Sequence, residues 1–190
     1  MKQNRENPFF ETYRTPFGTP PFDQIETEQY EPAFDEGIWQ LDEEVRAIAD
    51  NTELPTFENT IIALERSGKL LDKVISAFFN VLNAEADDEM MDISQRVSPK
   101  LSESSNNIYL NEQLFARVKS VYDRKDELHL PMEDARLLEE TFEAFCVRGA
   151  ALGPEEKEKY RKLSSELSLL SLTFDQNALK DKNRYELLLT

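Results

Sequence analysis

The sequence contains a single histidine, His129, and a single cysteine, Cys146, among its 190 residues. One cysteine cannot form an intrachain disulfide, so the chain is compatible with a reducing compartment. A tetrahedral zinc site requires three or four ligands from histidine, cysteine and carboxylate side chains. The two residues lie on either side of a predicted loop-to-helix boundary and form no ligand motif. We therefore interpret them as a surface histidine and a half-buried thiol, in preference to metal ligands or a Cys–His nucleophile.

Basic residues are also scarce, because 22 Lys and Arg stand against 38 Asp and Glu and give a net charge of −16. Such a chain repels phosphate backbones and anionic lipids, which argues against nucleic-acid and membrane partners. The first ten residues are polar and lack the apolar core of a signal peptide, and no run approaches the roughly 18 apolar residues of a membrane span. These features predict a cytoplasmic protein. The 5 glycines are few for a β-fold rich in tight turns.

The common catalytic motifs are missing, since the sequence has no P-loop, no dinucleotide-binding glycine motif and no nucleophile elbow. Between Asp23 and Glu58, however, twelve acidic residues accompany one base, Arg46. Most of these acids lie off the apolar stripe of one helix, so we favour a solvated helix face. An acid/base pair for glycoside hydrolysis and a surface that attracts basic peptides remain alternatives. We predict no catalytic, cofactor-binding or metal-binding residue in this chain.

Hydrophobic residues make up 39% of the chain and include 12 Phe, enough for a globular core. They recur at helical spacing along most of the sequence. Between residues 30 and 48 the apolar positions step by four and three, which predicts a helix with one buried stripe. The stripe consists of Tyr30, Phe34, Ile38, Leu41, Val45 and Ile48. Because this period continues to Phe174, we predict an all-α fold, a multi-helix antiparallel bundle-like domain of about six main helices.

Proline and the aromatic residues divide the chain into three predicted parts. Residues 1–26 contain four prolines, which forbid a continuous helix, and are predicted to form an extended arm. We expect aromatic rings to pin the arm across the helices. These rings are Phe9, Phe10, Tyr13, Phe17 and Phe22. Residues 27–182 are predicted to form the helical domain. Residues 183–190 are predicted to begin a truncated extended segment, because apolar residues alternate there.

Inside the helical domain we predict one continuous second helix from Thr56 to about Ala84, with Thr56 as its N-cap and Asn59 completing the cap. In the next helix Pro99 predicts a kink or break near Ser98. Residues 126–131 are predicted to form a loop.

The last predicted helix has an apolar face wider than one packing seam needs. Its heptad line is Tyr160, Leu163, Leu167, Leu170 and Phe174, and Leu169 and Leu172 widen it. The second helix is similarly broad. We therefore expect an exposed apolar patch, or a self-association of the chain that hides it. The residues expected to take part are some of Ile62, Phe79, Leu169, Leu172 and the segment Tyr185–Leu189.

Several segments occur in the order and spacing of one known family. They are TPPFDQI at 19–25, YEPAF at 30–34, PTFENTIIALERSG at 55–68, FFN at 78–80, SPKLS at 98–102, IYLN at 108–111 and FCVRGAAL at 145–152. In these segments the chain resembles the N-terminal helical region of the thimet-oligopeptidase-like zinc metallopeptidases, in the branch of oligopeptidase A and bacterial peptidyl-dipeptidase. The resemblance covers nearly the whole chain from about Phe17.

The resemblance implies that these helices form one wall of a deep channel that admits short peptides to a catalytic half. In that family the catalytic half holds zinc on a His-Glu-x-x-His helix, and this chain has neither that motif nor a counterpart of the family's other catalytic residues. The implied role is a non-catalytic N-terminal fragment of a zinc metallopeptidase. Its implied partners are the missing C-terminal catalytic region and short peptides.

The competing hypothesis is a self-contained helical module that binds a protein or peptide in a groove. Amphipathic helices around such a groove would produce the same periodicities. We expect an independent module to end on a polar cap, whereas this chain ends on Leu187, Leu188 and Leu189 before Thr190. The fragment is therefore the interpretation we favour. A small independent hydrolase is disfavoured because no nucleophile or metal set is assembled.

Overall fold

The structure is a computed structural model that describes residues 7–85 and 87–184. The described residues form helices and turns without a strand, which confirms the predicted all-α fold. Six of their helices are eleven residues or longer. These are α1 (Tyr30–Ala49), α3 (Lys69–Glu85), α4 (Asp88–Tyr109), α5 (Glu112–Tyr122), α7 (Met132–Val147) and α8 (Pro154–Arg184). Two short helices, α2 (Ala63–Glu65) and α6 (Lys125–Leu128), lie in the connections.

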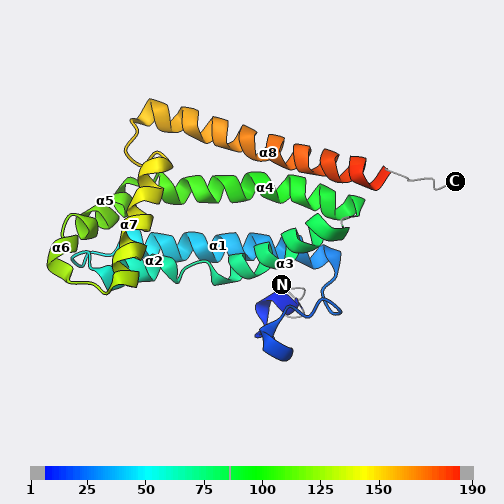
Figure 1. Cartoon of the computed structure of the whole chain (residues 1–190), viewed down its shortest axis with the longest axis horizontal. Coiled ribbons are helices and arrows are strands. Elements are labelled where there is room, and N and C mark those ends of the chain that lie inside the picture. Colours follow the sequence, from blue (N-terminus) through cyan, green and yellow to red (C-terminus); the bar gives the residue numbers. More distant parts are fainter. Residues whose placement is uncertain (1–6, 86, 185–190) are drawn as a thin grey trace.

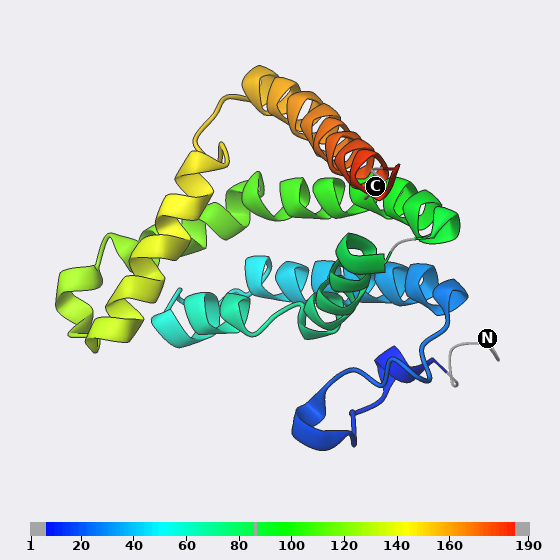
Figure 2. The same ribbon diagram turned by 45° about the vertical axis from the view of Figure 1, so that its right-hand side comes forward.

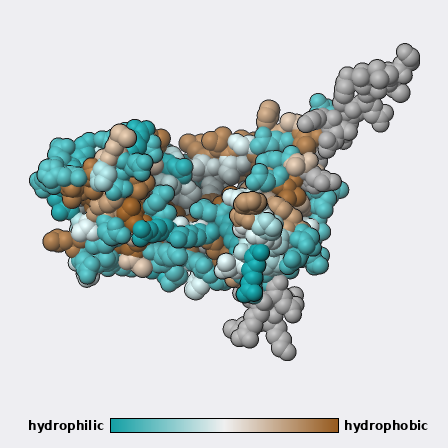
Figure 3. All heavy atoms as spheres, turned by 60° about the horizontal axis from the view of Figure 1, so that its bottom comes forward, coloured by the Kyte–Doolittle hydropathy of each residue, from teal (hydrophilic) through white to brown (hydrophobic). Residues whose placement is uncertain are grey.

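The long helices form a layered stack (Figure 1). α1 packs against α3 and α4, and α4 packs in turn against α8, which forms the outermost layer (Figures 1 and 2). The chain reverses direction between α1 and α3, between α3 and α4, and between α4 and α8. α5 and α7 pack together across one end of this stack. On the face drawn in Figure 3 hydrophilic residues dominate, with hydrophobic areas between them.

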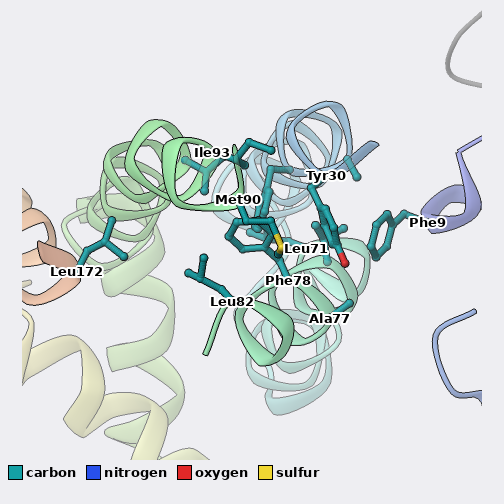
Figure 4. Close-up of a cluster of buried hydrophobic side chains, with 13 residues drawn as sticks. Phe9, Tyr30, Leu71, Ala77, Phe78, Leu82, Met90, Ile93 and Leu172 are labelled. Carbon is teal, nitrogen blue, oxygen red and sulfur yellow. The ribbon is translucent and has the colours of Figure 1, made fainter. Parts of the chain in front are cut away.

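Two clusters of buried side chains form the core. The first lies between α1, α3 and α4 (Figure 4) and includes Phe34, Phe78 and Val97. The second lies where α5, α7 and the end of α1 meet, and includes Leu114, Leu138 and Phe145. All six apolar positions predicted along α1 contribute to these clusters, as buried or partly buried side chains. The prediction for the first helix is therefore confirmed along its whole stripe.

The continuous second helix predicted from Thr56 to Ala84 is wrong, because the chain breaks at Gly68. A π-helical segment, Phe57–Ile62, leads into α2, and α3 begins only at Lys69. Gly68 has φ +74°, a left-handed conformation that glycine adopts without strain. Its N–H donates to Glu44 Oε2 of α1 at 2.7 Å. The predicted cap is confirmed, since Thr56 Oγ1 accepts from the Asn59 N–H and Asn59 Oδ1 accepts from the Thr56 N–H.

Two other local predictions also differ from the structure. α4 runs without interruption from Asp88 to Tyr109, so of the kink or break predicted near Ser98 the break does not occur. Proline inside a helix costs about 3 kcal/mol, and the buried side chains of α4 on both sides of Pro99 offset this cost. Residues 126–131 are not all loop, because α6 spans Lys125–Leu128 before His129 turns the chain with φ 46°.

The described part of the N-terminal arm is anchored by only some of its aromatic rings. Phe9 is buried, and its ring centroid lies 5.3 Å from that of Tyr30. Lys73 of α3 donates to the carbonyls of Phe9 and Glu11 at 2.8 and 2.6 Å, and its Nζ lies 3.7 Å above the ring of Tyr13. Burial raises the pKa of Tyr13 to about 12.

Phe10 is partly buried against the first cluster, but the remaining two rings, Phe17 and Phe22, do not pin the arm as predicted. Phe17 is fully exposed and has φ 61°, and Phe22 is half exposed. The arm also contains short 3₁₀ turns at Pro8–Phe10 and Pro16–Gly18, so it is not uniformly extended. The boundaries at residues 26 and 182 stay predictions. α8 is helical as far as Arg184, and the predicted extended segment Tyr185–Leu189 lies outside the described residues.

The crossing of α1 and α3 depends on Gly37. A methyl group on Gly37 would lie 3.0 Å from the Cα of Leu71 and 3.1 Å from its nitrogen, closer than van der Waals contact. Alanine gains about 1 kcal/mol of helix propensity over glycine, whereas overpacking costs typically about 1–3 kcal/mol. We expect Gly37→Ala to lower the free energy of unfolding by about 1 kcal/mol in a urea titration. Gly153→Ala is the control, since its methyl group would meet only Glu156 Oε2 at 3.6 Å; equal losses would contradict this reasoning.

A carboxylate near the start of α1 ties this helix to α4. Arg96 donates to Glu31 with its Nε and Nη2 at 3.1 and 3.0 Å, and this hydrogen bonding, helped by the charges of Arg96 and Lys100, lowers the pKa of Glu31. A carboxyl whose pKa is lower in the folded state contributes stability above its unfolded pKa of about 4.3. That stability is lost as the pH falls through the folded pKa.

We expect Glu31→Gln to lower the free energy of unfolding at pH 7 by less than about 1 kcal/mol, because the pair is partly exposed. At a pH below the folded pKa of Glu31 the difference between the variant and the unmodified chain should disappear. Urea titrations at pH 7 and at acid pH measure this difference in the free energy of unfolding, with Glu133→Gln in the first turn of α7 as the control. A difference that persists unchanged at acid pH would contradict the assignment.

Candidate functional site

A groove of about 470 Å³ runs between α4 and α8, within the size range of ligand pockets. Serines from both helices line it: Ser98, Ser102 and Ser105 of α4, and Ser164, Ser168 and Ser171 of α8. In each helix the three serines step by four and three residues, which places them on one face. Two rows of hydroxyl groups therefore face the same groove. This 4–3 spacing of serines is visible in the sequence and is the signal that could have indicated the groove.

Polar side chains hold the two helices together across this groove. Asn106 Nδ2 donates to Ser164 Oγ at 2.9 Å. Toward the C-terminal end of α8, Gln176 Nε2 donates to Ser94 Oγ at 3.0 Å. At its N-terminal end, Lys157 is buried and donates to Glu112 Oε1 at 3.0 Å. α8 is thus held on α4 by hydrogen bonds, and its N-terminal end is tied by an ion pair to α5, which begins at Glu112.

A guanidinium group lies at one end of the groove. Arg148, which caps the C-terminus of α7, donates to Ser105 Oγ at 3.1 Å. Its guanidinium carbon lies 4.2 Å from the ring centroid of Tyr109, a cation–π contact. Both partners are uncharged, so the positive charge of Arg148 is not neutralised by either contact. The groove therefore offers hydroxyl groups for polypeptide amides and a cation for a carboxylate.

The two residues weighed as metal ligands or as a nucleophile pair lie apart. His129 precedes the start of α7, and Cys146 is exposed near its end. α7 separates them by about 20 Å at 1.5 Å per residue. Among the described residues, moreover, no group of three His, Cys, Asp or Glu side chains is arranged to hold a metal ion. The thiol predicted to be half-buried is exposed.

The acidic cluster between Asp23 and Glu58 is only partly a solvated face. Glu31 and Asp35 pair with Arg96 and Lys100 of α4. Asp42 accepts from Ser104, again on α4, at 3.1 Å. Together with Glu44, whose contact with Gly68 is described above, these acids fix the position of α1 against its neighbours. Their role in the structure is packing and pairing between helices.

The exposed apolar patch predicted for the last helix exists, and of the described residues named for it only Leu169 is exposed. Leu172 is buried on α4, and Ile62 and Phe79 are partly covered. Leu169 is exposed at the edge of the patch. The exposed line is the heptad seam itself: Leu163, Leu167, Leu170 and Phe174 have exposed fractions of 65%, 64%, 66% and 72%. These residues were not named for the patch because periodicity finds an apolar line without showing which element covers it.

Comparison with known proteins identifies the relatives of this chain. It is 43% identical over 173 residues to dipeptidyl carboxypeptidase of Escherichia coli (strain K12), a match that covers 91% of this chain and 25% of the relative. It is 25% identical to an organellar oligopeptidase A of Arabidopsis thaliana, over 92% of this chain and 22% of the relative. Oligopeptidase A of Escherichia coli (strain K12) is 23% identical, over 87% of this chain and 24% of the relative. No family model matches.

The chain is a homologue of these peptidases. The resemblance inferred from its motifs is therefore confirmed. The chain spans about a quarter of the length of these curated relatives, so most of each relative has no counterpart here. Within the described residues, no helix is both long and apolar enough to cross a membrane.

Proposed function

We propose that this chain is the non-catalytic N-terminal segment of a peptidase of the dipeptidyl carboxypeptidase or oligopeptidase type. In this proposal it forms one wall of a channel that admits short peptides to a catalytic part located elsewhere in the longer protein. The observation that carries the proposal is a match over 91% of this chain to only 25% of a dipeptidyl carboxypeptidase. A cytoplasmic location belongs to the same proposal; among the relatives, one is described as a probable cytosolic oligopeptidase A.

The groove between α4 and α8 suits the inner side of such a wall. An unfolded peptide presents amide N–H and C=O groups along its length, and two rows of serine hydroxyls can donate to and accept from them. Arg148 supplies a positive charge for a carboxylate of the peptide. A rigid stack of helices also excludes folded proteins sterically, and closing it over a peptide excludes water from the reaction.

Zinc, which the resemblance implies for the longer protein, does not fit the residues of this chain. A His-Glu-x-x-His site uses two histidines one helical turn apart, and the sequence has only His129. We therefore assign no catalytic step to any residue described here. Metal binding and peptide cleavage belong, in this proposal, to the remaining part of the longer protein.

A segment exchange tests the proposal. We would replace the 173-residue matched segment of the Escherichia coli dipeptidyl carboxypeptidase with the corresponding residues of this chain and assay cleavage of a fluorogenic peptide. The chimera should be active, because the segment would supply the same wall. An unrelated helical domain of equal length, inserted at the same position, serves as the control and should be inactive. A chimera whose catalytic part is folded but which cleaves no peptide would overturn the proposal.

The isolated chain itself is expected to hold no stoichiometric zinc and to cleave no peptide, because its sequence lacks the ligands. Elemental analysis after dialysis and the same peptide assay measure these two properties. One tightly held zinc ion per chain would refute this prediction, and so would peptidase activity that copurifies with the monomer.

The alternative is a self-contained helical interaction module. One observation favours it, the exposed line of apolar residues on α8, since exposed apolar patches mark interaction sites. The chimera separates the two hypotheses. A module with an independent role has no reason to restore peptidase activity, whereas a channel wall does.

A further inference from the structure

α8 turns its larger apolar face away from the rest of the molecule. Leu163, Leu167, Leu170 and Phe174, which we call the outer stripe, are each about two-thirds exposed. Their spacing of four, three and four residues sets them in one line along the helix, the arrangement of a helix–helix seam. Figures 1 and 2 show α8 as the outermost layer, so no described element lies beyond it.

The inner face of α8 is polar by contrast. Of its described side chains only Leu172 joins the buried core, at the edge of the cluster in Figure 4. Its hydrogen bonds to α4 are polar contacts and include those of Arg161, Ser164 and Gln176. An amphipathic helix normally buries its apolar face. In α8 the apolar face is exposed and the polar face packs on α4. This arrangement indicates that both faces of the helix are packing surfaces.

Charge is also depleted around the outer stripe. Between Leu163 and Phe174 the sequence has one charged residue, Glu166, in a chain with 32% charged residues. A solvent-exposed helix face would be expected to carry charged residues at about the average frequency of the chain. The depletion is typical of a surface that is covered by another polypeptide.

A second copy of the chain is a poor occupant for this surface. Each copy carries a net charge of −16, so two copies repel one another at low ionic strength. Stable interfaces between proteins bury about 20–30 residues on each side, and the outer stripe supplies four. A partner that is joined covalently avoids both problems, because its effective concentration is high.

We propose that the outer stripe is the docking surface for the remaining part of a longer peptidase chain, through an apolar, charge-poor helix of that part. This proposal rests on the proposed function. The match with the Escherichia coli relative covers 173 of the 190 residues, so it includes at least residues 18–173 wherever it begins. Nearly all of the outer stripe therefore belongs to a segment that, in the relative, is accompanied by three times its own length of further polypeptide.

The test measures how accessible the outer stripe is in the isolated chain and in the chimera described above. Leu167→Cys is introduced into a Cys146→Ser background, and the rate of maleimide labelling at residue 167 is followed by peptide mass mapping. Leu54→Cys is the matched control, because Leu54 is an exposed leucine in the connection after α1, away from α8. Residue 167 should label rapidly in the isolated chain and at least about tenfold more slowly in the chimera, while residue 54 labels at similar rates in both.

The outcomes separate this proposal from the proposed function. Equal labelling of residue 167 in the isolated chain and in an active chimera would overturn the docking surface and leave the proposed function standing. Loss of activity in the chimera would overturn the proposed function instead. Labelling that slows as the isolated chain is concentrated, together with a dimeric mass in sedimentation, would assign the outer stripe to a second copy. If maleimide labelling of residues 54 and 167 slowed to the same extent in the chimera, a docking surface on α8 would be contradicted.

Discussion

Replacing Phe78 with alanine is expected to lower the free energy of unfolding by about 4 kcal/mol, the largest single effect in the first cluster. The Phe78 ring is fully buried. Its centroid lies 5.0 Å from that of Tyr30, 5.3 Å from Phe34 and 5.2 Å from Phe79, all in edge-on arrangements. The substitution removes these contacts and leaves a cavity between α1 and α3, which two helix backbones cannot close without moving.

Phe174→Ala in the isolated chain is the matched control, since it removes the same ring from the exposed outer stripe. We expect this control to change the free energy of unfolding by less than about 0.5 kcal/mol. Urea titration followed by circular dichroism measures both variants. A loss of more than about 2 kcal/mol for Phe174→Ala would show that α8 buries its outer stripe against the chain itself.

The first helix was predictable from the sequence because one signal determined it. α1 has a single apolar stripe from Tyr30 to Ile48, and in the structure that stripe meets α3, α4 and α5. Hydrophobic periodicity is most informative when only one face of a helix is apolar. The capping pair Thr56 and Asn59 was equally readable, since its hydrogen bonds are local in the sequence.

The break at Gly68 was not predictable from the local pattern. Glycine fits inside a helix at a modest cost and also fits the left-handed position that ends one. The contact that accompanies the break, Glu44 with the Gly68 N–H, joins residues 24 positions apart. Periodicity within one segment carries no information about such a partner.

The candidate groove was missed for a related reason. Ser98, Ser102 and Ser105 match Ser164, Ser168 and Ser171 in spacing, but nothing in either segment indicates that α4 and α8 are neighbours. The outer stripe was recognised as an apolar heptad line, but it was not among the residues predicted to be exposed. The sequence of an amphipathic helix shows which residues form its apolar line. Whether another element packs on that line depends on the rest of the polypeptide.

Replacing Arg117 with methionine is expected to lower the free energy of unfolding by about 3 kcal/mol. Arg117 of α5 is buried, and the sequence analysis did not single it out. Its Nη1 donates to the carbonyls of Asn51 and Glu53 at 2.6 and 3.0 Å. Its Nη2 donates to Asn59 Oδ1 and Thr60 Oγ1 at 3.1 and 3.3 Å. One guanidinium thus joins the end of α1 to the beginning of the π-helical segment.

Two opposing terms decide the sign of this effect. Methionine relieves the desolvation of a cation that is paired only with neutral acceptors and whose Nε has no described partner. It also takes the Arg117 donor from three acceptors, the carbonyls of Asn51 and Glu53 and Thr60 Oγ1, whereas Asn59 Oδ1 keeps the N–H of Thr56. Each unsatisfied buried group costs about 1–3 kcal/mol. The acceptor losses outweigh the relief.

Arg117→Lys should recover only part of the stability, because an ammonium group cannot reproduce the two-pronged geometry of a guanidinium. Arg136→Met, which removes an exposed pair with Glu140, is the control and should cost less than about 0.5 kcal/mol. Urea titrations compare the three variants, and a methionine variant as stable as the control would show that α5 needs no cation at this position.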